Sequence, residues 1–281
     1  MLFVLTNILI TKWKIRIART FYFFIKIIIR KDELIIKRNG IRFYVNLEEG
    51  IDLHLFLFGN FQKHIYSNPL INLSKKAIIF DVGANIGAMS LVFAQKVPNG
   101  QVYSFEPTDF AYSKMQKNLK LNPDLASKIS LEQTFIYSNS TNKHELKAYS
   151  SWKLTKGGHK HPIHRGIAKP TNNIPTITID DYCEKNHINR LDFIKIDTDG
   201  YEYEILKGAL KTLTKLKPKI IFEIGIYIMD EKNLIFKDYI NYFEGLGYEI
   251  RTIKGKQVCN GNFKKHIPLN GTVDLFAIPK S

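Results

Sequence analysis

The stretch Ala77-Ile78-Ile79-Phe80-Asp81-Val82-Gly83-Ala84-Asn85-Ile86-Gly87 decides the fold of this chain. Its leading apolar residues form a short run, which is typical of a strand buried on both faces of a parallel sheet. The strand is expected to end at Asp81, and Gly83 and Gly87 then allow a tight turn with no Cβ in a ligand's way. Apolar residues at helical spacing predict a helix over 86–97. Such a strand, glycine turn and helix would present free backbone N–H groups to a ligand.

A second strand is expected at residues 101–105, with Glu106 at its carboxyl end and Pro107 after it. Nucleoside-binding sheets place a carboxylate there, roughly 20 residues beyond the glycine turn, against the ribose hydroxyls. The alternative is that Glu106 caps the helix expected at 108–121. The glycine turn upstream favours the ribose interpretation.

The spacing of the glycine turn distinguishes between nucleoside cofactors. A dinucleotide fingerprint reads G-x-G-x-x-G/A, whereas Asn85 stands here at the middle position, so the glycine that admits a pyrophosphate is missing. Asp81 would repel a phosphate, but its charge suits a zwitterionic ligand such as the methionine part of S-adenosylmethionine. A methyltransferase is therefore favoured over a nicotinamide-dependent oxidoreductase.

A third strand is expected at 129–137, and the side chains at 134 and 135 would lie near an adenine at its carboxyl end. The residues expected to bind the cofactor are Asp81, Gly83, Ala84, Asn85, Gly87, Glu106, Pro107, Thr134 and Phe135.

Composition indicates a globular chain, because 44% of the 281 residues are hydrophobic and both signs of charge are present. The two cysteines provide neither a disulfide framework nor a metal cluster, which favours a reducing, cytoplasmic location. A net charge of +15 suits a nucleic acid, an anionic membrane or an acidic substrate. A general richness in Lys, Asn and Ile explains it as well, so local concentrations of charge are more informative.

Residues 1–31 are apolar and basic, with seven cations between positions 12 and 31 and no acidic residue before Asp32. The uncharged run 1–11 is too short to span a bilayer and lacks the basic flank of a signal peptide. Because aromatic residues interleave the cations, the segment could lie on an anionic membrane, peripherally at the inner surface. The alternative is a helix that packs on the catalytic domain or on a partner chain.

Residues 1–70 are expected to form an amino-terminal accessory region, followed by a catalytic domain over 71–281. The partial alternation of 34–47 around Asn39-Gly40 predicts a β-hairpin. Residues 51–66 have a helical period that is interrupted at Gly59-Asn60.

Residues 151–173 show no regular period and contain five Lys and Arg residues without an acidic one. Long irregular segments inside compact domains are usually functional or mobile. We expect this segment to bind an acidic acceptor, through Lys160, His161, His164 and Arg165. A metal site at His159-x-His161 is not expected, because no carboxylate or cysteine is near in sequence.

The second half of the chain repeats the alternation of strands and helices. Strands are expected at 191–196 and 219–224, helices at 178–185, 202–215 and 232–243, and a closing hairpin at 248–254 and 272–279. Asp197 follows the fourth strand and Glu223 lies near the end of the fifth.

The chain resembles the FkbM-like family of S-adenosylmethionine-dependent methyltransferases, over about residues 40–281. The motifs that carry the resemblance are residues 80–87, 105–107, 194–202, 206–209 and 222–224. The resemblance implies an α/β fold with the Rossmann-like class I methyltransferase sheet, in which one strand is antiparallel. It also implies O-methylation of a sugar or polyketide hydroxyl. Many relatives carry Glu where this chain has the shorter Asp199, which leaves a direct role for that residue open.

Methyl transfer to a hydroxyl requires alignment and a group that removes the proton. Asp197 and Glu223 are the candidates, and either could instead bind a metal or hold the methionine ammonium group. The alternatives to a methyltransferase are the oxidoreductase above and a non-catalytic sugar- or lipid-binding protein. A nucleic-acid substrate is not expected, because neither Asn-Pro-Pro-Tyr nor Asp-Pro-Pro-Tyr follows the fourth strand.

Overall fold

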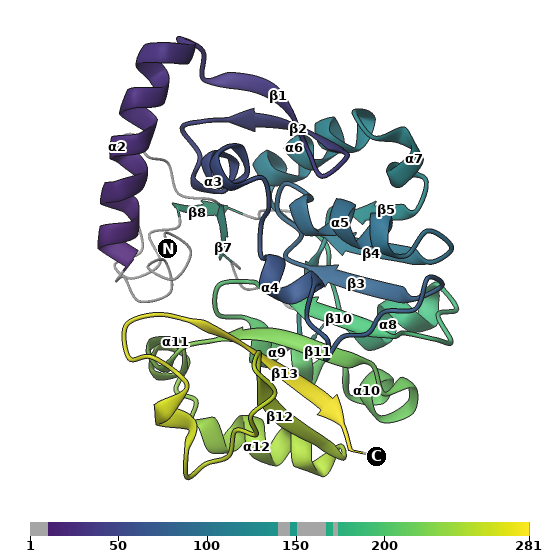
Figure 1. Cartoon of the computed structure of the whole chain (residues 1–281). Helices are drawn as coiled ribbons and strands as arrows, with labels where there is room; N and C mark the ends of the chain where they lie inside the picture. Colours follow the sequence, from purple (N-terminus) through teal and green to yellow (C-terminus); the bar gives the residue numbers. More distant parts are fainter. Residues whose placement is uncertain (1–10, 140–146, 151–166, 171–173, 281) are drawn as a thin grey trace.

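The computed structural model describes residues 11–139, 147–150, 167–170 and 174–280. A seven-stranded sheet forms its centre (Figure 1). From edge to edge, the strands are β12 (Tyr248–Thr252), β13 (Val273–Pro279), β11 (Lys219–Ile224), β10 (Phe193–Ile196), β3 (Ile78–Val82), β4 (Gln101–Phe105) and β5 (Ile129–Glu132). Only β13 runs against the direction of the others in this sheet. The expected α/β sheet with one antiparallel strand is confirmed.

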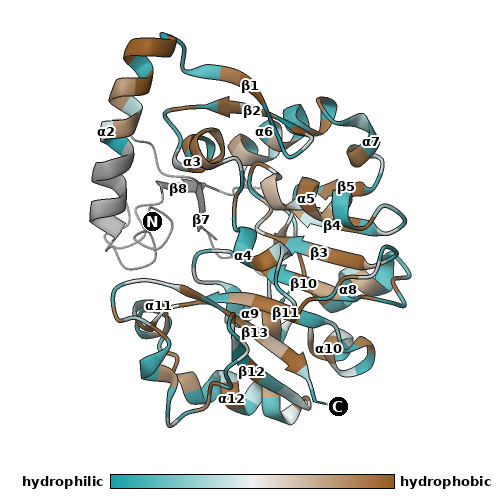
Figure 2. Cartoon of the chain, viewed as in Figure 1, coloured by the Kyte–Doolittle hydropathy of each residue, from teal (hydrophilic) through white to brown (hydrophobic). Residues whose placement is uncertain are grey.

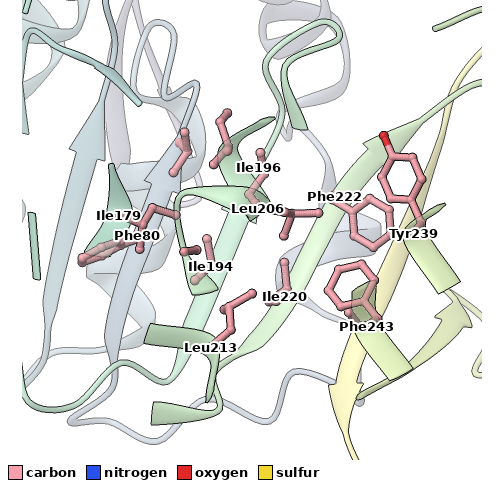
Figure 3. Packing of buried hydrophobic residues seen from close by; sticks show 14 of the residues in the cluster. Phe80, Ile179, Ile194, Ile196, Leu206, Leu213, Ile220, Phe222, Tyr239 and Phe243 are labelled. Atoms are coloured by element: carbon pink, nitrogen blue, oxygen red, sulfur yellow. The ribbon is translucent and has the colours of Figure 1, made fainter. Parts of the chain in front are cut away.

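One face of the sheet is covered by helices from the second half of the chain. Phe80, Ile194 and Phe222 point from the strands into a buried apolar cluster with side chains of these helices (Figure 3). The helices are α8 (Ile179–Lys185), α9 (Glu202–Lys207), α10 (Leu210–Leu216) and α12 (Phe236–Gly245). Burial of this apolar surface is the main force that holds the layer on the sheet.

The other face is covered by elements from the first half. Ile79, Phe193 and Ile221 share one apolar cluster with side chains of these elements. They include the hairpin β1 (Glu33–Arg38) and β2 (Ile41–Asn46), and the helices α3 (Gly50–Phe58), α4 (Lys63–Tyr66), α5 (Ala88–Lys96), α6 (Asp109–Lys120) and α7 (Pro123–Ala126). Helix α2 (Thr11–Ile29) joins the same cluster from the periphery of the molecule, next to α3 (Figure 1). Residues before position 70 therefore contribute to the same core as the sheet.

Polar contacts also bind the hairpin to the turn between α6 and α7. Asn122 accepts a hydrogen bond from the Arg42 N–H (2.9 Å) and donates one to the Arg42 carbonyl (2.7 Å), as a neighbouring strand would. Lys114 and Asp52 form a buried ion pair between α6 and α3. The turn Asn39-Gly40 has positive φ at both residues, which confirms the predicted two-residue hairpin.

The third strand is shorter than predicted. It ends at Glu132, and β6 (Phe135–Ile136) pairs instead with β9 (Thr176–Ile177) in a separate sheet. The reason is local, because the Thr134 hydroxyl and the Phe135 N–H both donate to the Pro175 carbonyl and draw the chain away from β4.

Three other expected elements differ from the structure. Residues 202–215 form two helices that are separated at Gly208 and Ala209. A Cβ at Gly208 would lie 2.4 Å from the Tyr137 carbonyl oxygen, so the chain passes close to another segment at this break. The helix expected at 232–243 begins at Phe236, and α11 (Ile226–Glu231) precedes it, separated by Asn233 in a left-handed conformation. The segment 151–173 is not wholly irregular, since β8 (Ile167–Pro170) pairs with β7 (Lys147–Ser150).

The remaining described elements are a short 3-10 helix, η1 (Phe263–Lys265), and the loops between the strands and helices. Within the described ranges, no helix has both the length and the apolar character needed to cross a membrane.

Candidate active site

The glycine turn after β3 packs directly on the end of β10. Gly83, Asn85 and Gly87 all have positive φ, at 75°, 50° and 79°. A Cβ on Gly83 would lie 1.9 Å from the Asp197 carbonyl oxygen, and one on Gly87 would lie 2.7 Å from Met115 Cγ. Glycine is therefore required at both positions, and the turn is held against Asp197.

The prediction that this turn presents free backbone N–H groups is wrong for most of it. The N–H groups of Gly83 and Ala84 both donate to the Phe105 carbonyl at 3.0 Å, and that of Gly87 donates to the Ala84 carbonyl. The Asn85 side chain offers a different contact, because its Oδ1 is buried without a hydrogen-bond partner among the described residues. An acceptor atom in that position fits a donor on a bound ligand.

Glu106 connects the glycine turn to the start of α6. One carboxylate oxygen accepts from the Asn85 N–H (2.9 Å), and the other accepts from the Thr108 N–H and hydroxyl (2.9 and 2.6 Å). Burial raises the pKa of Glu106, while these hydrogen bonds and Lys195 act in the opposite direction. The capping alternative thus has a structural basis, and contact with a ribose stays a prediction. Pro107 follows as expected, partly exposed.

Asp81 is paired within the protein, which the sequence did not indicate. It lies inside β3, fully buried, and accepts from the Ser90 hydroxyl at 2.6 Å. Its other oxygen is 3.2 Å from Lys195 Nζ on the neighbouring strand. The charge that was expected to meet a zwitterionic ligand is therefore balanced by Lys195, so a direct cofactor contact through Asp81 stays a prediction.

Lys195 is a site residue that the sequence analysis missed. Its Nζ lies between Asp81 and Asp197, 3.5 Å from Asp197 Oδ2. Burial alone lowers the pKa of Lys195, but the two carboxylates outweigh that effect and raise the pKa, so the amine is charged. A lysine inside an otherwise apolar strand was the available signal, since a buried cation needs a partner.

Gln62 is the second missed residue, and it comes from the segment between α3 and α4. Its Nε2 donates to Asp197 Oδ2 at 2.8 Å, while its Oε1 is buried without a partner in the described part of the chain. The chain is also held just after Gln62, in α4, where His64 Nε2 lies 2.6 Å from Asp274 Oδ2 on β13. Asp197 keeps 26% of its side chain exposed.

Three more acidic residues surround Asp197. Glu202 accepts from the N–H groups of Thr198 and Gly200 and so shapes the turn after β10. Burial, followed by the charge of Asp197, raises the pKa of Asp199 to about 8. Burial and the neighbouring carboxylates raise the pKa of Glu223 well above its usual range, and Glu223 accepts from the Thr272 hydroxyl at 2.5 Å.

The side chains predicted to lie near an adenine are both buried, and Phe135 packs against aromatic rings. The Thr134 hydroxyl donates to the Pro175 carbonyl, and the Phe135 ring packs edge-on against Tyr201, 5.1 Å between centroids. Lys232 Nζ lies 4.2 Å from the centre of the Tyr201 ring. The adenine contact stays a prediction.

The predicted acceptor-binding residues Lys160, His161, His164 and Arg165 lie outside the described residues. In the part of the chain that is described, no group of three or more His, Cys, Asp or Glu residues is arranged to hold a metal ion.

The sequence of the chain matches the model of a known protein family. The family model of the Methyltransferase FkbM domain matches residues 81–250, more than half of the chain. The chain belongs to the FkbM methyltransferase family. It is therefore an enzyme that transfers methyl groups, and its cofactor is S-adenosylmethionine.

Individual relatives of this FkbM methyltransferase are about a quarter identical to it over the aligned part of the chain. It is 26% identical to methyltransferase sdnD of Sordaria araneosa, over 58% of this chain and 71% of sdnD. It is 24% identical to hexuronic acid methyltransferase AglP of Haloferax volcanii, over 51% of this chain and 54% of AglP. The crystal structure of methyltransferase FkbM from Methylobacillus flagellatus has the same fold, with a TM-score of 0.50 and 20% identity, over 76% of this chain and 47% of that one. The chain thus spans about half of AglP and of the Methylobacillus protein.

Proposed function

We propose that this enzyme transfers the methyl group of S-adenosylmethionine to a hydroxyl oxygen of a glycan, with Asp197 as the base. The observation that carries the proposal is the position of Asp197. It follows β10 at the carboxyl edge of the sheet, touches the glycine turn through its backbone, and stays partly exposed. Ligands of open α/β sheets bind at this edge.

The residues around the turn fit the cofactor. Glu106 would accept hydrogen bonds from the ribose hydroxyls, and the unpartnered Asn85 Oδ1 would accept from a donor on the cofactor. When bound, the cofactor supplies a methyl group on a sulfonium, so the protein has mainly to align the acceptor with it.

Asp197 removes the hydroxyl proton in this proposal. Lys195 and Gln62 both contact Oδ2, which leaves Oδ1 as the oxygen to take the proton. Lys195 places a positive charge 3.5 Å from Oδ2, and a carboxylate can accept a proton as a general base. Glu223 is the weaker candidate for the base, because its raised pKa favours the protonated form.

An acidic sugar is the acceptor class that we propose. AglP, which is similar to the matched domain, carries the name of a hexuronic acid methyltransferase. Residues 151–173 contain five Lys and Arg residues and no Asp or Glu, and their positive charge would attract an acidic acceptor.

The test is to incubate the purified full chain with methyl-labelled S-adenosylmethionine and two matched sets of oligosaccharides, one containing uronic acids and one neutral. We expect label in an ether linkage on the acidic set, and much less with Asp197→Asn. Binding of a glycan without any transfer of label would indicate a non-catalytic binding protein. Transfer to the neutral set alone would contradict the acidic acceptor but not the methyl transfer.

A further inference from the structure

The outward face of α2, together with β1, carries a concentration of exposed apolar side chains. Among the described residues, six of the ten large apolar side chains that are exposed lie there, namely Phe21, Phe23, Phe24, Ile27, Ile28 and Ile35. We call these six residues the α2 surface. Ile28 is 80% exposed and Phe23 is 62% exposed. Figure 2 shows the hydrophobic end of α2 at the periphery of the molecule.

The inner side of α2 holds the helix in place, so the exposure is not that of a detached segment. Tyr22 is buried in the core cluster, with Ile25 and Ile29 packed against it. The Tyr22 hydroxyl donates to Asp32 Oδ1 at 2.8 Å, and Lys26 forms an ion pair with the same residue at 3.1 Å. These contacts fix which residues face outward.

Cations are more frequent than acids next to the α2 surface in sequence, where Glu33 on β1 is the exposed acid. Residues 1–31 contain no acidic residue, and Arg19, Arg30 and Lys31 are exposed on α2 or just after it. The nearest acid, Asp32, is already paired with Lys26. An apolar face bordered by cations is typical of helices that lie in the interface of an anionic membrane.

We propose that the α2 surface docks on an anionic lipid bilayer, with the apolar side chains among the acyl chains and the cations at the headgroups. A second copy of the chain fits less well, because it would bring an equally basic helix against this one, and like charges repel. The proposal does not depend on which acceptor is methylated.

The test is co-sedimentation of the full chain with vesicles of neutral phosphatidylcholine, or with the same vesicles containing phosphatidylserine. The variant Phe24→Ser/Ile28→Ser removes apolar area from the α2 surface. The matched control is Ile235→Ser/Leu269→Ser, at exposed apolar positions elsewhere that are 61% and 68% exposed. Circular dichroism establishes that both variants fold, and light scattering gives the mass of each in solution.

We expect the parent chain and the control to bind the anionic vesicles, with binding weakened at high salt, and the α2 variant to lose at least tenfold in partition. Equal binding by both variants would overturn the proposal. Equal binding of the parent chain to the neutral and the anionic vesicles would also overturn it. The parent chain could instead fail to bind vesicles and form a dimer that becomes a monomer in the α2 variant. That result would assign the α2 surface to contact with a second copy of the chain.

Discussion

Gln62 Nε2 donates a 2.8 Å hydrogen bond to Asp197 Oδ2, across 135 positions of sequence. Gln62 stands before the matched family domain, which begins at residue 81, whereas Asp197 is at the centre of the site. Its backbone is left-handed, with φ of 47°, which is unfavourable for a residue other than glycine. The amino-terminal region thus contributes directly to the surroundings of the proposed base.

Replacing Gln62 by Met removes the donor and keeps the length of the side chain. A hydrogen bond to a charged group contributes about 1.5–3 kcal/mol, so kcat should fall roughly 10- to 100-fold if the bond orients Asp197 for the reaction. The KM for S-adenosylmethionine should change little. His64→Ala serves as the control, because it loosens the same segment at Asp274 without removing a contact of Asp197. An unchanged kcat in Gln62→Met would show that the bond has no part in turnover.

Glu106→Ala should weaken the binding of S-adenosylhomocysteine by about 2–4 kcal/mol, since two charge-assisted hydrogen bonds to the ribose are lost. Titration calorimetry measures the affinity directly. Because Glu106 also accepts from the Thr108 hydroxyl, which caps α6, Thr108→Val provides the control for loss of this hydroxyl and its cap. Equal affinity of Glu106→Ala and the parent chain would contradict the ribose contact.

The buried pair of Asp52 and Lys114 makes the stability of the fold depend on pH. Burial raises the pKa of Asp52 to about 6, and Lys114 lowers it only in part. The folded state therefore holds this proton more tightly than the unfolded state does. The stability that Asp52 contributes is complete below the pKa of an unfolded Asp, and it is lost as the pH rises through about 6.

The comparison with Asp52→Asn isolates this effect, since the amide does not titrate. From about pH 4 to pH 7, the free energy of unfolding of the parent chain should fall relative to that of the variant, by up to about 3 kcal/mol. Denaturant unfolding followed by circular dichroism gives both curves. Curves that stay parallel over this range would mean that Asp52 titrates alike in both states.

Local patterns predicted the framework of the site. The buried strands β3, β4, β10 and β11 follow from short apolar runs, and the positions of Asp197 and Glu106 follow from where those runs end. The hairpin could also be predicted, because its two-residue turn requires positive φ and Asn39 and Gly40 are residue types that adopt it.

Contacts between distant segments could not be predicted in the same way. Nothing near Gln62 in sequence indicates that its side chain reaches Asp197. Lys195 lies beside Asp81 only because β10 pairs with β3 in one particular register, which the sequence of either strand does not reveal. The division of 129–137 into β5 and β6 depends on Pro175, which lies far along the chain. Each of these features arises from tertiary contacts that override a local preference.

The central claim is that Asp197 is the base for methyl transfer, and Asp197→Asn tests it most directly. The amide keeps the shape but cannot take the proton. Single-turnover methylation of the acceptor and calorimetry with S-adenosylhomocysteine should be measured on the same preparation. The account predicts that methylation falls at least 100-fold while the affinity for S-adenosylhomocysteine stays within about threefold of the parent value. Full methylation, or a loss of affinity that accounts for the loss of rate, would contradict it.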